Sequence, residues 1–215
     1  MKVAVIAGTP IDTEFGENIL KEAGYKDIIG IAVSNNPVEQ TIFQAASDEY
    51  KELHINKILL SLKNKSCSNL FVYCNSLSGA VDFKKLAKKN AINVVTPLNV
   101  YEDMANKFNK VAVLAANAQG LAGIEKVMMT KNPNLVFIGF TFLEMVKSIE
   151  KKEDISKIAR DFKFKELTEL IELYKVEKII LGCTHFPYIE KELAKYTNID
   201  ILNPAKYMLT KLKER

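Results

Sequence analysis

Long hydrophobic runs and paired cysteines are both missing from this sequence of 215 residues. The apolar run at its N-terminus, residues 3–7, is too short to cross a membrane or to serve as a secretory signal, and it ends at Gly8. The three cysteines are an odd number, which argues against a disulfide framework and for free thiols in a reducing compartment. We therefore expect a cytoplasmic protein with no membrane partner.

Glycine-rich phosphate loops are missing as well. The loop 8–13 lacks the glycines of a dinucleotide fingerprint and the Gly-Lys-Ser/Thr of a P-loop, so a flavin or nicotinamide enzyme is disfavoured. The net charge of +4 comes from lysines interleaved with acidic residues along the chain, which indicates a solvated surface. No nucleic-acid partner is expected.

The sequence does contain a regular alternation of short β-branched runs and longer stretches with helical periodicity. With 48% hydrophobic residues the chain can bury a core, and such alternation is typical of β-α units around a parallel sheet. Helices are expected between the strands, including the amphipathic segments 37–65 and 153–175. The expected strands lie near residues 2–7, 27–33, 69–73, 92–95, 110–115, 135–138, 177–181 and 200–202.

The two halves of the chain repeat one pattern. Lys-Val-Ala-Val-Ile-Ala-Gly at 2–8 reappears as Lys-Val-Ala-Val-Leu-Ala-Ala at 110–116, and at nearly the same spacing downstream an apolar strand runs into Cys74 or Cys183. Chance similarity between common strands is the alternative, and the matched spacing to two cysteines argues against it. The predicted fold class is α/β with two pseudo-symmetric lobes, each a mainly parallel sheet flanked by helices. The predicted lobes are residues 1–96 with 203–215, and residues 97–202.

Both cysteines are expected at the carboxyl ends of strands, where the ligand crevice of an open α/β sheet lies. Each precedes a helical stretch, whose positive end favours a thiolate. If the lobes face each other, the two sulfurs flank one carbon, and a thiolate and a thiol can invert a stereocentre by proton exchange, because a free cysteine titrates near ~8.5. We predict Cys74 and Cys183 as the catalytic pair, with Asn75, Ser76 and Thr184 as donors to a substrate carboxylate.

Other polar residues near these cysteines have two interpretations each. His185 either exchanges a proton with the second cysteine or is a surface histidine at a helix start. The first loop carries Thr9, Asp12 and Thr13. In one interpretation they face the crevice, and Asp12 orients a substrate ammonium or tunes Cys74. In the other, Asp12 or Thr13 is only a helix N-cap.

Cys67 and His54 are expected to be structural. Cys67 lies in a polar turn and has no counterpart in the second half, and His54 lies inside a predicted helix. Cys183 and His185 are two potential zinc ligands without a third or fourth at a recognisable spacing, so no metal site is predicted.

The segments Cys74-Asn75-Ser76 and Gly-Cys-Thr-His-Phe-Pro at 182–187 together resemble the two signatures of the aspartate/glutamate racemase superfamily, and the resemblance spans nearly the whole chain. It implies an amino-acid racemase that needs no cofactor and works by 1,1-proton transfer. Cys74 and Cys183 would be its acid/base pair. The implied ligand is an amino acid or another small carboxylate, and a homodimer is an expectation at the level of the family.

The resemblance is a hybrid within that superfamily. His185 follows the pattern of glutamate racemases, whereas the loop 10–13 is similar to the Gly-Pro-x-x-Thr loop of aspartate racemases. Residues 35–37 and Thr41 are similar to the aspartate racemase loop that runs from Asn-Asn-Pro to Arg-Thr, but Gln40 stands where the arginine would be. A neutral glutamine lacks both the charge and the planar fork with which arginine binds a carboxylate.

A second departure follows the strand 110–115, where Asn117 and Gln119 stand in place of an Ala-Thr-x-x-Thr motif. The resemblance assigns Asn36, Gln40, Asn117 and Gln119 to substrate binding. Together the departures allow a substrate whose side chain is not acidic.

Two kinds of rival function stay open. Maleate isomerases, hydantoin racemases and arylmalonate decarboxylases share the fold and the thiols but catalyse different reactions. A non-catalytic protein that binds a small ligand is the other rival, although binding alone needs no paired acid and base.

Overall fold

The computed structural model describes residues 1–214 and contains, within that range, all eight strands that the sequence predicts. The strands are β1 (Lys2–Ala7), β2 (Asp27–Ala32), β3 (Asn69–Val72), β4 (Asn93–Val95), β5 (Lys110–Ala115), β6 (Val136–Thr141), β7 (Lys178–Gly182) and β8 (Ile201–Leu202). The α-helices are α1 (Pro10–Glu22), α2 (Pro37–Ala45), α3 (Asp48–Asn64), α4 (Asn75–Ala80), α5 (Phe83–Asn90), α6 (Pro97–Met104), α7 (Ala118–Lys131), α8 (Leu143–Glu150), α9 (Ile155–Asp161), α10 (Phe164–Leu173), α11 (Glu190–Leu193) and α12 (Pro204–Lys213). The 3₁₀ segments are η1 (Ala105–Lys107) and η2 (Phe186–Ile189).

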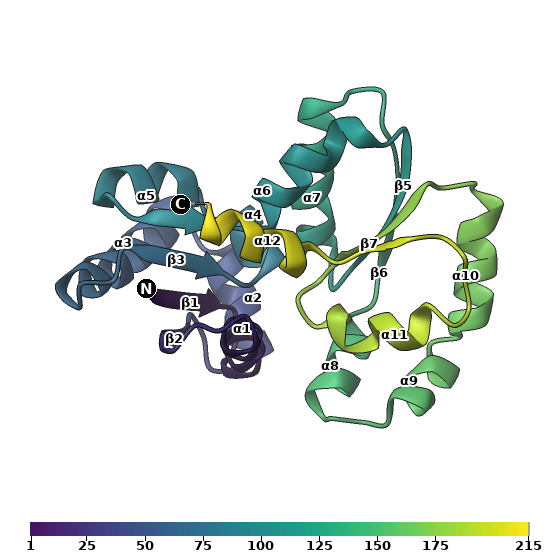
Figure 1. The fold of residues 1–215 in the computed structure, drawn as a ribbon, viewed down its shortest axis with the longest axis horizontal. Helices are drawn as coiled ribbons and strands as arrows, with labels where there is room; N and C mark the ends of the chain where they lie inside the picture. Colours follow the sequence, from purple (N-terminus) through teal and green to yellow (C-terminus); the bar gives the residue numbers. More distant parts are fainter. Residues whose placement is uncertain (215) are drawn as a thin grey trace. The chain divides into compact units, whose positions relative to one another are not determined.

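The strands form two four-stranded parallel sheets of the same order, β2-β1-β3-β4 and β6-β5-β7-β8, each flanked by helices (Figure 1). The predicted fold class is therefore confirmed. The chain divides into two compact units, one formed by residues 1–100 with the residues from Ala205 onward, the other by Tyr101–Pro204. The divisions between the units fall within α6 and at the start of α12. The predicted lobe boundaries, 96/97 and 202/203, lie a few residues before them. None of the helices in residues 1–214 has the length and apolar character that a membrane span requires.

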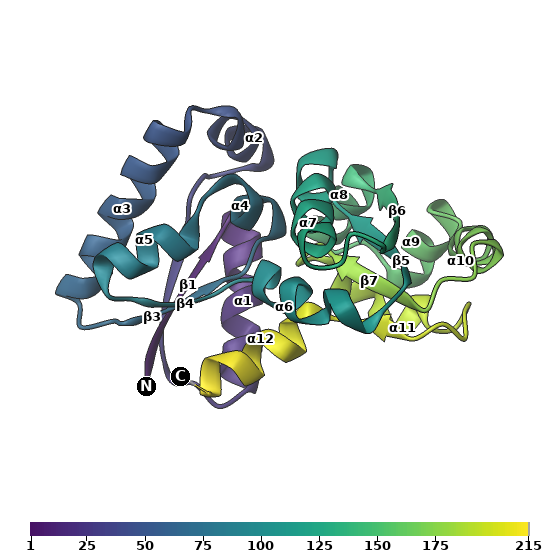
Figure 2. The same ribbon diagram turned by 90° about the horizontal axis from the view of Figure 1, so that it is seen from above.

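In the first unit the sheet lies between α1 on one face and α3 with α5 on the other (Figure 2). Alternate residues of β1 point to opposite faces, as the pleat of a strand requires. Ala4 and Ile6 join Leu59 of α3 in the apolar core. Val5 faces α1, where a Cβ on Gly16 would collide with the Val5 side chain. Gly16 therefore lets the helix approach the strand closely.

In the second unit α7 packs on β5, β6 and β7, and α10 covers the other face of the sheet (Figures 1 and 2). The central strand β5 is buried on both faces, which explains its continuous apolar run. Ile124 and Met128 lie one turn apart on α7, and both are fully buried. They form the face that α7 turns toward the sheet.

Two segments predicted as continuous helices are each interrupted, so those predictions are wrong in detail. The segment 37–65 forms α2 and α3, and α3 begins after Ser47, whose side chain accepts a hydrogen bond from the N–H of Tyr50. The segment 153–175 forms α9 and α10, separated by Lys163 in the left-handed conformation with φ of 52°. Apolar periodicity continues across both breaks, so the sequence pattern alone does not mark them.

Candidate active site

Each sheet has a switch point beside its central strand. The chain places β2 on one side of β1 and β3 on the other, and it repeats this arrangement with β6 and β7 around β5. A crevice opens at the carboxyl ends of the strands at such a point. The loops that leave β1 and β3 carry Gly8 and Cys74, and those that leave β5 and β7 carry Asn117 and Cys183. The two cysteines therefore occupy equivalent positions in two similar sheets.

Cys74 is the N-cap residue of α4 and is 3% exposed. Its backbone carbonyl accepts a hydrogen bond of 2.7 Å from the Ser78 hydroxyl, which fixes the turn, and its Sγ lies 3.5 Å from Oγ of Ser76. Asn75, the next residue, is buried as well. α4 has only six residues, and Cys183 precedes a 3₁₀ segment, so the helical field at either sulfur is weaker than the sequence predicts.

Two glutamine side chains of α2 reach the surroundings of Cys74. Nε2 of Gln40 lies 3.4 Å from both Sγ of Cys74 and Oγ of Ser76. Nε2 of Gln44 donates to Oγ of Ser76 at 2.8 Å. The amide of Gln40 also lies against Gly8, where a Cβ would collide with it. Gln44 is a site residue that the sequence analysis missed, because nothing distinguishes one glutamine of an amphipathic helix from another.

A capping box holds the loop that presents Gln40. Asn36 is the N-cap of α2 and accepts from the N–H of Glu39 at 2.9 Å. The carboxylate of Glu39 accepts from N and Nδ2 of Asn35, both at 2.8 Å, and from Nδ2 of Asn36 at 3.0 Å. These hydrogen bonds, first that from the Asn35 backbone, hold the pKa of Glu39 below its ordinary value of 4.5. Asn36, predicted to bind substrate, orders this loop in the structure.

We expect Glu39→Gln to loosen this loop and to lower the free energy of unfolding slightly at neutral pH. The stabilising effect of Glu39 is present above its unfolded-state pKa, near 4.5, and is lost as the pH falls through its lower folded-state pKa. Urea unfolding of parent and variant should therefore give different free energies at pH 7 that converge as the pH falls below 4.5. Glu14→Gln, on an exposed position of α1, is the control and should match the parent throughout. A Glu39→Gln difference that persists undiminished at pH 3 would contradict the assignment.

The loop after β1 ends at Thr9, which is the N-cap of α1 because its side chain accepts from the N–H of Asp12 at 3.3 Å. The alternative that Asp12 or Thr13 is the N-cap is therefore wrong. Oγ1 of Thr13 donates to the carbonyl of Thr9 at 2.9 Å and to that of Ile31 at 3.3 Å, which ties α1 to β2. Asp12 is a carboxylate buried in the first turn of α1, at the crevice end of the sheet.

The second unit presents Cys183 beside an imidazole and a carboxylate. Sγ of Cys183 lies 3.6 Å from Nδ1 of His185, and Nε2 of His185 lies 3.1 Å from Oε1 of Glu150. His185 is 4% exposed, so the alternative of a surface histidine is wrong. When the hydrogen on Nε2 is shared with Glu150, Nδ1 is the nitrogen that can exchange a proton with the sulfur. Thr184, between them in the chain, is buried too.

Glu150 is a further site residue that the sequence analysis missed. It ends α8 in a stretch rich in lysine and glutamate, which is typical of a solvated helix face. One signal was available in the helical spacing. Glu150 lies one turn after Val146, which with Met145 and Ile149 forms the buried face of α8.

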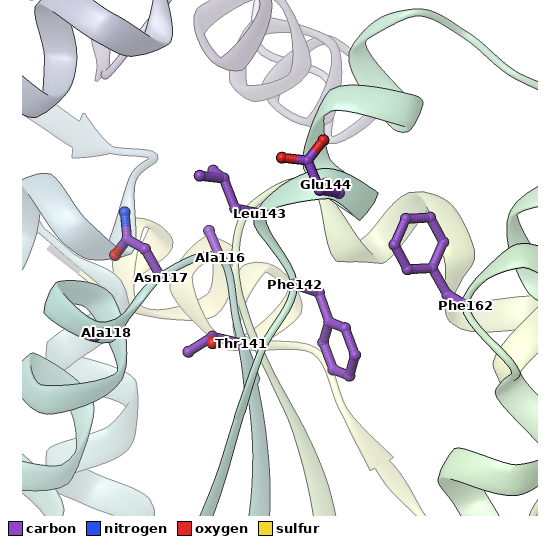
Figure 3. Close-up of a pocket in the computed structure, with 8 residues that line it drawn as sticks. All are labelled: Ala116, Asn117, Ala118, Thr141, Phe142, Leu143, Glu144 and Phe162. Carbon is purple, nitrogen blue, oxygen red and sulfur yellow. The ribbon is translucent and has the colours of Figure 1, made fainter.

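An open pocket of about 460 Å³ lies at the carboxyl ends of β5 and β6 (Figure 3). Asn117 lines it, and its Oδ1 also caps α7 by accepting from the N–H of Gly120 at 2.9 Å. Gln119, predicted to bind substrate, is exposed and is not one of the lining residues. The residues that line the pocket are Ala116, Asn117, Ala118, Thr141, Phe142, Leu143, Glu144 and Phe162.

The other candidate residues serve packing. Cys67 is buried in the core of the first unit. The ring of His54 contacts the rings of Phe43 and Tyr50, with centroids 5.3 and 6.3 Å away. Within residues 1–214, His, Cys, Asp and Glu side chains form no group of three or more that suits a metal ion.

Two sheets of identical order, each with a buried thiol at the end of an equivalent strand, define a two-lobed α/β protein with one crevice cysteine in each lobe. The sequence profile of the Asp/Glu/Hydantoin racemase family matches residues 3–212, and the chain belongs to this family.

Individual relatives are distant. A glutamate racemase of Limosilactobacillus reuteri (strain DSM 20016) is 26% identical over 167 residues, which are 75% of this chain and 61% of the relative, so less than two thirds of that relative is spanned. The fold is similar to that of glutamate racemase from Francisella tularensis subsp. tularensis SCHU S4 in complex with D-glutamate, with a TM-score of 0.74, 18% identity, and 99% of this chain and 79% of that chain covered. It is also similar to an aspartate racemase homologue from Pyrococcus horikoshii OT3, with a TM-score of 0.71, 14% identity, and coverage of 100% and 98%.

Proposed function

We propose that the protein is a cofactor-independent amino-acid racemase in which Cys74 and Cys183 are the acid/base pair. The observation that carries the proposal is the placement of two buried thiols at the crevice ends of equivalent strands, β3 and β7. Family membership supports the reaction class. The D-glutamate bound by the Francisella tularensis relative supports a small amino acid as the ligand.

The two thiols invert the α-carbon by two proton transfers. For one enantiomer, the thiolate of one cysteine takes the α-hydrogen as a proton, and the electron pair of the C–H bond stays on the substrate as a carbanion. The thiol of the other cysteine then gives its proton to the opposite face of that carbon and becomes the thiolate. The other enantiomer reacts with the roles exchanged. Each transfer by a positioned group contributes roughly 10²- to 10⁴-fold to the rate.

The surrounding residues stabilise charge on the substrate. Asn75, Ser76 and Thr184 are donors for the α-carboxylate, whose neutralisation lowers the free energy of the neighbouring carbanion. Asp12 supplies a negative charge for the ammonium group. His185, oriented by Glu150, exchanges a proton with the second thiol. We assign the remaining predicted residues to the loops and first helical turns around the substrate: Thr9, Thr13, Asn36, Asn117 and Gln119.

The side chain of the substrate need not be acidic. Gln40 contacts Cys74 and Ser76 through an amide, which makes hydrogen bonds but no ion pair with a distal carboxylate. We therefore propose that amino acids with uncharged side chains are accepted.

Incubation with single enantiomers of a panel of amino acids in D₂O, without added cofactor, tests the proposal. Racemisation predicts that the α-hydrogen signal is lost in ¹H NMR while chiral chromatography shows the opposite enantiomer appearing. A product that is not an enantiomer of the amino acid supplied would indicate isomerase or decarboxylase chemistry instead. Binding of an amino acid without any exchange would favour the non-catalytic binding protein, and an absence of both would contradict the proposal.

A further inference from the structure

The pocket at the ends of β5 and β6 is not explained by the acid/base chemistry. Figure 3 shows Asn117 and Ala118 on one side and Phe162 on the other, with the segment from Thr141 to Glu144 between them. Its volume of about 460 Å³ is in the range of sites that hold small organic molecules.

The strand register places this pocket next to Cys183. Ala115 of β5 pairs with both Gly182 of β7 and Thr141 of β6. The residues that follow on these strands, Ala116, Cys183 and Phe142, therefore leave the same edge of the sheet in adjacent rows. Neighbouring strands lie about 4.8 Å apart, so the pocket opens roughly 5 Å from the cysteine backbone and extends to roughly 10 Å. That distance is within the reach of an amino-acid side chain whose α-carbon contacts the sulfur.

Five of the eight residues that line the pocket are apolar. Phe142 and Phe162 are half-buried, and Leu143 is 44% exposed although it is a large apolar residue. Ala116 and Ala118 have small side chains that leave the space open.

The charge of the pocket disfavours an acidic group. Glu144 alone among the eight lining residues is ionisable, and its carboxylate lies 2.6 Å from Nζ of Lys147. The lining therefore offers a substrate carboxylate no cation, because the ammonium of Lys147 is already paired with Glu144. Only neutral donors, Asn117 and Thr141, line the pocket to bond such a carboxylate, and neither has the charge of an arginine or lysine.

We infer that this pocket receives the side chain of the substrate, and that the substrate is an amino acid with an apolar or aromatic side chain. The inference rests on the proposed function, because it assumes that the α-carbon lies at Cys183. Phenylalanine and leucine should therefore exchange their α-hydrogens at a higher kcat/KM than aspartate and glutamate.

The test uses Ala118→Phe, which places a ring at the pocket wall on the exposed first turn of α7. It should lower kcat/KM for phenylalanine by roughly tenfold or more, and it should lower kcat/KM for alanine, whose methyl group does not reach the pocket, much less. Ala194→Phe, the same change at an exposed position of the same unit, is the control and should affect neither substrate. Faster exchange of aspartate or glutamate than of phenylalanine and leucine in the parent would overturn the inference, as would an equal loss for alanine and phenylalanine in Ala118→Phe.

Binding of 3-phenylpropanoate, followed by NMR titration, separates the two proposals. If no amino acid exchanges but 3-phenylpropanoate binds the parent and not Ala118→Phe, the racemase proposal fails and the ligand class of the pocket stands. If 3-phenylpropanoate binds both proteins equally or neither, the pocket inference is wrong whatever the exchange experiments show.

Discussion

Replacing either Cys74 or Cys183 by alanine is expected to abolish racemisation, with a rate lower than that of the parent by roughly 10² to 10⁴. Alanine can neither take nor give a proton, whereas the thiol on the opposite side keeps its function. Each single variant should therefore still exchange the α-hydrogen of one enantiomer with D₂O, and the two variants should act on opposite enantiomers. Parallel ¹H NMR exchange and chiral chromatography of both enantiomers measure this directly.

Cys67→Ala is the matched control for these variants. Cys67 is buried in the core of the first unit, and its Sγ donates to the carbonyl of Asn69 at 3.6 Å. Its replacement should cost about 1 kcal/mol of stability and leave the rate per folded molecule near that of the parent. The double variant of Cys74 and Cys183 should be no slower in racemisation than either single variant, because the two thiols act as a unit. A Cys74→Ala protein that racemises at the parent rate would exclude the two-thiol mechanism.

Replacing His185 by glutamine is expected to slow racemisation by roughly 10²-fold. Nδ1 of His185 is the group beside Sγ of Cys183, and a glutamine side chain cannot exchange a proton there at neutral pH. His185 acts through the thiol, so a change in rate alone would not separate this role from a packing defect. The pH profile of exchange and the alkylation rate of Cys183 by iodoacetamide should both change in His185→Gln.

Glu150→Gln and His54→Gln are the companion variants for this prediction. Glu150→Gln keeps the shape but weakens the orientation of the imidazole, so its effect on rate and alkylation should be in the same direction and smaller. His54→Gln replaces a histidine that packs on aromatic rings and should leave both readouts unchanged. If His185→Gln slows racemisation while the pH profile and the alkylation rate stay at parent values, the proton-exchange role is wrong.

The strands and the two cysteines could be predicted because their signals are local. A buried parallel strand shows as a continuous apolar run, and the repeat of that run with a cysteine at the same offset is visible without knowing the fold. Gln44 could not be predicted in this way, and for Glu150 the only signal was its helical spacing from Val146. Their roles depend on Ser76 and His185, which are distant in sequence, and on polar side chains that look like ordinary helix surface.

The breaks in the predicted helices have a related cause. Lys163 adopts a left-handed conformation. Glycine or asparagine at this position would have indicated a helix end, whereas lysine gives no such signal. The pocket could not be predicted from the sequence either, because its walls come from separate segments, the ends of β5 and β6 and Phe162 after α9. The family resemblance predicted Asn117 as a substrate ligand, and the structure shows that its side chain also caps α7.

The first unit is not continuous along the chain, since α12 belongs to it and brings the buried side chains Met208 and Leu212. A ribosome therefore releases every residue of the second unit before it releases the helix that the first unit lacks. Until α12 emerges, the first unit lacks one of its helices, while every residue of the second unit has already been synthesised. The first unit can therefore be completed only after the synthesis of the whole second unit.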